Sequence, residues 1–166
     1  MTSTRTVNGF LSLLFAAMAA VIPLVAPFAR AGDTVPFEGI FEGTFAINPF
    51  TLQLHFEGDG LARHLGDSEI VGDSQLAPNG PGCFAIVADA VTLTAANGDH
   101  LFLTNVGEDC FDDTGHIVGS ATFTVTGGTG RFAGATGTGT TRVVATPDQT
   151  GFAGTFVLTV AGRISY

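Results

Sequence analysis

The sequence predicts an all-β protein, a small closed antiparallel β-barrel of about eight strands. The first observation is that apolar and polar residues alternate with a period of two through most of the chain after residue 31. The second is that glycine and phenylalanine alternate on one predicted face, as in Phe41, Gly43 and Phe45. Small barrels fill their tapering interior with such alternating large and small residues. Closure also removes exposed sheet edges, and composition leaves a β-sandwich open as the alternative.

The N-terminal residues, 1–31, have the pattern of a signal peptide. Arg5 supplies a positive charge, residues 10–25 form an uncharged apolar run, and Ala29-Arg30-Ala31 is a small-residue cleavage site. An uncleaved membrane anchor is the alternative, but the prolines near the end of the run argue against it. Residues 32–166 are then expected to form a single domain of a secreted or periplasmic protein.

The composition excludes one class of partner. The chain contains fifteen aspartates and glutamates against six basic residues, and its formal net charge is −9. An acidic surface repels phosphate backbones, so nucleic acid is not an expected partner. No second apolar run is long enough for a membrane-spanning helix, so no stable membrane insertion is expected.

The first part of the domain is predicted to be a run of strands. Asn48-Pro49 ends the first strand, and Phe50 begins the inward face of the second. Gly58-Asp59-Gly60 is expected to turn the chain, and residues 77–82 to form a loop. The expected strands cover residues 37–47, 50–57, 61–65 and 68–76.

The two cysteines flank a predicted hairpin. Residues 84–94 and 100–106 read as strands joined through Asn97-Gly98, a strong hairpin turn signal. Cys83 and Cys110 then face each other across the base of this hairpin. An exported chain favours a disulfide between them, and two buried free thiols are the alternative.

The last part of the domain contains a glycine-rich turn between two threonine-rich strands. The expected strands cover residues 117–125, 138–146 and 152–164. The turn includes Gly127, Gly128, Gly130 and Phe132. At least one of Gly128 and Gly130 is expected to have a positive φ.

These residues resemble a known family. The segment GGTGRFAGA, residues 127–135, resembles a signature of the dirigent and allene oxide cyclase-like barrel proteins. Arg63-His64-Leu65-Gly66 is similar to the HLG segment of exported bacterial members, and Gly154-Thr155-Phe156 to the closing strand. The resemblance implies an eight-stranded antiparallel barrel with an apolar cavity. It carries no activity over, because the catalytic residues of the plant cyclases match no positions in this chain.

Two sets of carboxylates are candidates for chemistry. Asp89 shares an alternating face with Val91 and Leu93, where a carboxyl among apolar groups would have a raised pKa and could act as an acid or a base. A β-bulge that returns Asp89 to solvent is the alternative. The predicted acidic loop, residues 107–115, could hold calcium or be simply solvated. Its carboxylates are Glu108, Asp109, Asp112 and Asp113.

The function that these observations favour is a secreted, soluble, non-catalytic barrel that binds a small apolar molecule without a cofactor. The first alternative is an isomerase or cyclase of the allene oxide cyclase type. The second is a structural or surface protein, including an outer-membrane barrel. An open apolar interior favours binding, an open interior with a buried carboxylate favours catalysis, and a filled one favours structure. The candidate lining residues are Phe41, Phe45, Leu54, Phe123, Phe156 and Leu158.

Overall fold

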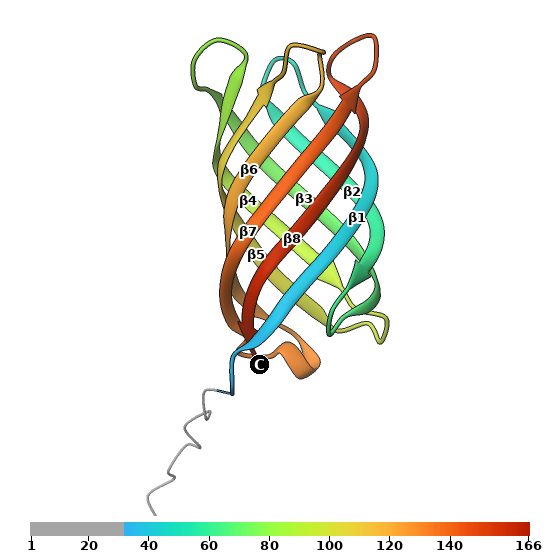
Figure 1. Ribbon diagram of the computed structural model, residues 1–166, viewed down its shortest axis with the longest axis vertical. Coiled ribbons are helices and arrows are strands. Elements are labelled where there is room, and N and C mark those ends of the chain that lie inside the picture. Colours follow the sequence, from blue (N-terminus) through green and yellow to red (C-terminus); the bar gives the residue numbers. More distant parts are fainter. Residues whose placement is uncertain (1–31) are drawn as a thin grey trace, which may run out of the picture.

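A computed structural model describes residues 32–166 and contains one closed barrel of eight antiparallel strands. Each strand pairs with the next, and β8 pairs with β1 to close the barrel (Figure 1). This confirms the predicted fold class. The predicted signal peptide, residues 1–31, lies outside the described residues. The strands are β1 (Val35–Ile47), β2 (Gln53–Ala62), β3 (Gly66–Pro78), β4 (Cys83–Thr94), β5 (His100–Phe111), β6 (Ile117–Gly128), β7 (Thr136–Pro147) and β8 (Ala153–Ser165).

The turn predicted at Gly58-Asp59-Gly60 is wrong, because β2 continues through these residues. Gly60 pairs with Phe41 of β1, and a side chain at residue 60 would collide with the Phe41 ring and the Ile40 carbonyl. The glycine therefore permits close packing within the barrel wall. The chain turns at residues 63–65 instead, where His64 has a φ of 73°.

Several other strand limits differ from the prediction. Phe50 is 94% exposed in the turn between β1 and β2, where its backbone N–H donates to Asn48 Oδ1. Residues 77 and 78 belong to β3, and β5 extends to Phe111 through the first half of the predicted acidic loop. In the two strand extensions, pairing with a neighbouring strand overrides the local turn signal.

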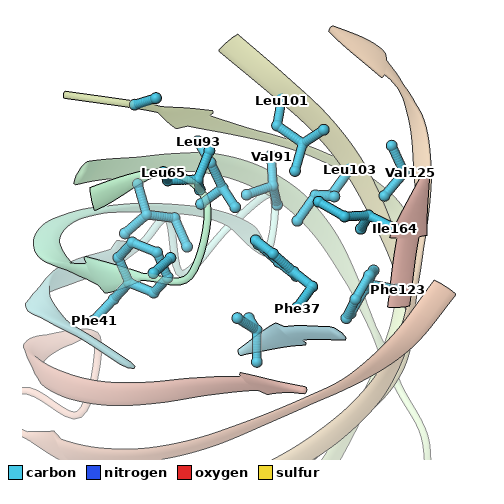
Figure 2. Close-up of a cluster of buried hydrophobic side chains, with 14 of the residues drawn as sticks. Phe37, Phe41, Leu65, Val91, Leu93, Leu101, Leu103, Phe123, Val125 and Ile164 are labelled. Atoms are coloured by element: carbon cyan, nitrogen blue, oxygen red, sulfur yellow. The ribbon is translucent and has the colours of Figure 1, made fainter. Parts of the chain in front are cut away.

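The fully buried part of the hydrophobic core fills one half of the barrel (Figure 2). Phenylalanine rings in it cover glycines on adjacent strands: the Phe123 ring lies against both Gly139 and Gly162. The Phe37 and Phe123 rings also meet edge to face, with centroids 6.1 Å apart. The largest fully buried side chains are Phe37, Phe41, Leu65, Ile70, Leu93, Leu101, Phe123, Phe132 and Ile164.

The glycine-rich turn closes this filled end. It contains a short 3-10 helix, η1 (Gly130–Phe132), drawn beside the C-terminus in Figure 1. Gly130 has a φ of 54° and Phe132 is fully buried, as the expected turn requires. The guanidinium of Arg131 donates to the His64 carbonyl at 2.7 Å and lies over the Phe132 ring. The Phe132 and Tyr166 rings are 5.0 Å apart. The turns at residues 63–65 and 129–135 and the C-terminal Tyr166 therefore pack together at this end of the barrel, and we call this cluster the plug.

The disulfide predicted between Cys83 and Cys110 is present, and the two residues form a register pair of β4 and β5. The hairpin at Asn97-Gly98 is also confirmed, with a φ of 83° at Gly98. Between the disulfide and this turn, the β4–β5 register is interrupted from Ala85 to Val91. The disulfide therefore joins the two strands on the far side of an irregular segment. In the part of the chain from 32 to 166, no helix is long and apolar enough to cross a membrane.

Candidate functional site

The half of the barrel opposite the plug contains a cavity of about 140 Å³. Its outer lining includes Ile47, Phe84, Phe111 and Phe152, which lie at or beside strand ends. These strand ends lead into the four hairpin turns at the top of Figure 1. The cavity is therefore at the end of the barrel away from the termini of the domain.

Part of the cavity wall is built from small side chains, which leave room in the interior. Ser74, Gly119, Ala121, Thr141 and Ala145 line it from β3, β6 and β7. Side chains of this size cannot reach across an eight-stranded barrel, whose interior is just wide enough for large side chains to fill. Two glycines beside the cavity do not create the space, because the Phe56 ring covers Gly72 and the Phe45 ring lies against Gly154.

Four of the six candidate lining residues border the cavity: Phe45, Leu54, Phe156 and Leu158. The other two do not. Phe41 and Phe123 are fully buried in the core of the filled half. Alternation places all six on the inner face, but it does not give their height along the barrel axis.

Asp89 faces the cavity, and a β-bulge is the reason that its orientation was ambiguous. On β3, Gln75 pairs with Ala88 and Leu76 with Ile86, so Val87 is an extra residue of β4 and is 60% exposed. Before the bulge the inward residues of β4 have even numbers, such as Ile86, and after it they have odd numbers, such as Asp89. The bulge predicted as the alternative for Asp89 is present, but it brings the carboxylate into the barrel.

Both carboxylate oxygens of Asp89 accept hydrogen bonds. Ser74 Oγ donates to Oδ1 at 2.5 Å, and the backbone N–H and side-chain amide of Asn105 donate to Oδ2 at 2.7 and 2.8 Å. Thr141 Oγ1 extends the network to Asn105 Oδ1 at 3.3 Å. Asp89 therefore links β3 to β5 where the β4–β5 ladder is interrupted. Its carboxylate accepts from the backbone N–H of Asn105, in the place of a backbone carbonyl of β4.

Asp109 is a second carboxylate on the cavity wall. It pairs with Gly119 of β6, and its carboxyl occupies the place that a side chain at residue 119 would fill. Within residues 32–166, no side chain or backbone N–H donates to this carboxyl. Burial, and then the charge of Asp89, raise the pKa of Asp109 to about 6. The sequence placed Asp109 in a loop, whereas β5 places it in the barrel wall.

The four carboxylates of the predicted acidic loop do not form one cluster, because Glu108 and Asp109 lie on β5 whereas Asp112 and Asp113 follow it. Glu108 is exposed and accepts a hydrogen bond from the side-chain amide of Asn79 at 2.9 Å. Asp112 closes the following turn, accepting from Thr114 Oγ1 at 2.7 Å, which lowers the pKa of Asp112. Asp113 is exposed in the same turn. Among the described residues, no group of three or more His, Cys, Asp or Glu side chains is arranged to hold a metal ion.

Two turns at the open end share a motif that the sequence reasoning missed. They are Asp112-Asp113-Thr114-Gly115 and Asp148-Gln149-Thr150-Gly151. In each, the first aspartate accepts from the threonine hydroxyl and backbone N–H, and the glycine has a positive φ. The repeated spacing of Asp, Thr and Gly was the available signal. These internal bonds give the mouth of the cavity two turns of defined shape.

The motifs that carry the family resemblance lie at the other end. Residues 127–135 and 63–66 meet in the plug, through the hydrogen bond from Arg131 to the His64 carbonyl. None of their residues lines the cavity. Comparisons with protein-family models, curated proteins and solved structures find no match to this chain.

Proposed function

We propose that this chain is an exported barrel that binds one small, largely apolar molecule in the cavity of its open half. The observation that carries this proposal is the cavity itself, whose wall combines apolar side chains of the mouth with small side chains of the barrel interior. A ligand entering through the mouth would contact Phe45, Phe156 and Leu158, and it would stop at the Asp89–Asn105 network. A preformed concave site with apolar walls and a few polar groups is typical of small-molecule binding.

The volume limits the size of the ligand. A cavity of about 140 Å³ is close to an engineered apolar cavity of about 150 Å³ that accepts benzene. The enclosed part of the ligand is then about the size of one six-membered ring or a short branched chain. A larger molecule would extend through the mouth between the turns.

Acid–base catalysis of an isomerisation in the same cavity is a second candidate function, and Asp109 is the observation that favours it. A carboxyl with a pKa of about 6 exchanges protons readily near neutral pH. It could move a proton between two atoms of one bound substrate, a reaction that needs no co-reactant. Asp89 is less suited to this role, because both its oxygens already accept hydrogen bonds.

Calorimetric titration of the protein with benzyl alcohol tests the binding proposal. We expect saturable binding to the wild-type protein and its loss in Ala121→Leu, because the larger side chain would occupy the cavity. Ala161→Leu is the matched control: Ala161 lies on β8 and is exposed, so the same added volume should leave binding unchanged.

Two results would contradict the proposal. One is no saturable binding of benzyl alcohol or of other single-ring compounds. The other is equal binding by Ala121→Leu and wild type, which would place the ligand outside the cavity. Turnover of a bound compound that is lost in Asp109→Asn, with affinity unchanged, would favour the isomerase.

A further inference from the structure

The cavity wall has an unbalanced charge. Two of its lining residues, Asp89 and Asp109, are carboxylic acids, and none of the described lining residues is Arg, Lys or His. The two carboxylates also differ in their partners. Asp89 is held by Ser74 and Asn105, whereas none of the described residues forms a hydrogen bond or an ion pair with the carboxyl group of Asp109.

A half-buried carboxylate without a protein partner is costly, and a ligand can supply the missing partner. The cost is visible as the raised pKa of Asp109, caused first by burial and then by the neighbouring charge of Asp89. Since that pKa is about 6, the carboxyl is mostly ionised at pH 7.5. A hydrogen-bond donor with a positive charge would satisfy it best.

We propose that the ligand of this cavity is a small apolar amine, whose ammonium group binds Asp109 while its hydrocarbon part packs against the phenylalanine and leucine side chains of the mouth. This inference rests on the proposed binding function and names the chemical class of the ligand. An aliphatic or benzylic ammonium matches both parts of the site: three N–H donors for the carboxylate and an apolar body for the walls.

Other charged ligands fit less well. An anionic ligand such as a fatty acid would meet two carboxylates and no basic side chain on the described wall, and the net charge of −9 repels it at longer range. A metal ion would leave the apolar walls unused, and residues 32–166 contain no group of three metal-binding side chains. The ammonium is the cation that both parts of the cavity accommodate.

Calorimetric titration with benzylamine, benzyl alcohol and benzoate at pH 7.5 tests the inference, because the three share one ring and differ in charge. We expect benzylamine to bind at least about tenfold more tightly than benzyl alcohol, as a hydrogen bond to a charged group would give. We expect benzoate to bind most weakly. Lowering the pH to 5 protonates Asp109 and should weaken benzylamine binding several-fold, with little effect on benzyl alcohol.

The variant Asp109→Asn should bind benzylamine and benzyl alcohol with similar affinity. The matched control is Glu108→Gln, which removes one negative charge from the adjacent, exposed residue and should keep the preference. Among residues 32–166, Asp89 is the only other titratable group that lines the cavity. On the strands beside Asp109, Glu108 of β5 is exposed, and so is Arg142 of β7, next to β6; neither lines the cavity.

The outcomes separate this inference from the binding proposal. If benzyl alcohol binds and benzylamine binds no better, the amine inference is wrong and the binding barrel stands. If Asp109→Asn folds with wild-type circular dichroism and keeps the full preference for the amine, the ammonium does not bind Asp109. If none of the three compounds binds, the proposed function itself fails.

Discussion

The two halves of this barrel are made by the same eight strands, yet one is filled and the other is hollow. In the filled half, Phe37 and Phe123 meet and phenylalanine rings cover the glycines of neighbouring strands. In the hollow half, the cavity wall includes the small side chains of Ser74, Ala121 and Thr141. The difference teaches that side-chain volume at a few inward positions decides whether such a barrel contains a cavity, while the strand topology stays the same.

The largest expected effect comes from truncating a phenylalanine in the filled half. Phe123→Ala should lower the free energy of unfolding by about 3–5 kcal/mol, because the close-packed core cannot collapse around the lost ring. Phe156→Ala, which makes the same change beside the cavity, should cost at least about 1 kcal/mol less, since its ring already borders open space. Urea denaturation of both variants measures the difference, and equal losses would break the distinction between the halves.

Removing the disulfide should affect the hollow half most. The cysteines are separated by 27 residues, and opening a loop of this size should cost roughly 3–4 kcal/mol in the chain-entropy model. We expect Cys83→Ala/Cys110→Ala to speed amide hydrogen exchange at the open end of β4 and β5 first. Uniformly faster exchange, including the residues of the plug, would show that the two halves unfold as one unit.

The two carboxylates of the cavity should respond in opposite ways to the same substitution. Asp109 has a folded-state pKa of about 6, above its ordinary value of 3.8, so the folded protein binds this proton more tightly than the unfolded chain. Its contribution favours the folded state below pH 4 and is lost as the pH rises from about 4 to 6. Asp109→Asn should therefore stabilise the protein above pH 6, by up to about 3 kcal/mol. Stability curves at pH 4 and pH 7.5 test this, and a variant less stable than wild type at pH 7.5 would refute it.

Asp89→Asn should destabilise the protein, by about 1–3 kcal/mol. Three donors converge on the two oxygens of Asp89, and an asparagine offers only one oxygen to them. The measurement is again the free energy of unfolding at pH 7.5. A neutral or stabilising result would mean that the Asp89 network does not compensate for the interrupted β4–β5 ladder.

The smallest expected effects are at the turns of the two ends. Gly151 has a φ of 76° with open space around it, so Gly151→Ala should cost about 1 kcal/mol through backbone strain alone. Gly130→Ala should cost more, because a new side chain at its φ of 54° would also displace the Asp99 carboxylate. Thermal unfolding of both variants compares them, and a larger loss at Gly151 would show that the plug is not the tighter end.

The sequence predicted the barrel and its disulfide because those features depend on local patterns. Alternation gives the inner face of each strand, and Asn97-Gly98 gives the hairpin that brings Cys83 and Cys110 together. Local patterns misplaced the turn at Gly58-Asp59-Gly60, since a glycine needed for contact with Phe41 looks the same as a glycine needed for a turn.

The candidate site was only partly predictable. Asp89 was selected from alternation, but its role depends on Ser74 and Asn105, which come from other strands. Asp109 was assigned to an acidic loop, because the pairing that extends β5 to Phe111 involves β6, which follows later in the chain. Position along the barrel axis, which separates lining residues from core residues, depends on the register of all eight strands.

The closure of the barrel by β1 and β8 has a consequence for how the chain folds. Seven of the eight ladders join strands that are consecutive in sequence, so each can form as a hairpin with a short turn. The remaining ladder pairs Val35 with Ile164 and needs contacts between distant parts of the chain. Closing so long a loop costs entropy before any of its contacts can form. We therefore expect the seam between β1 and β8 to form late, and the rate-limiting step of folding to be the curling of an open sheet onto itself.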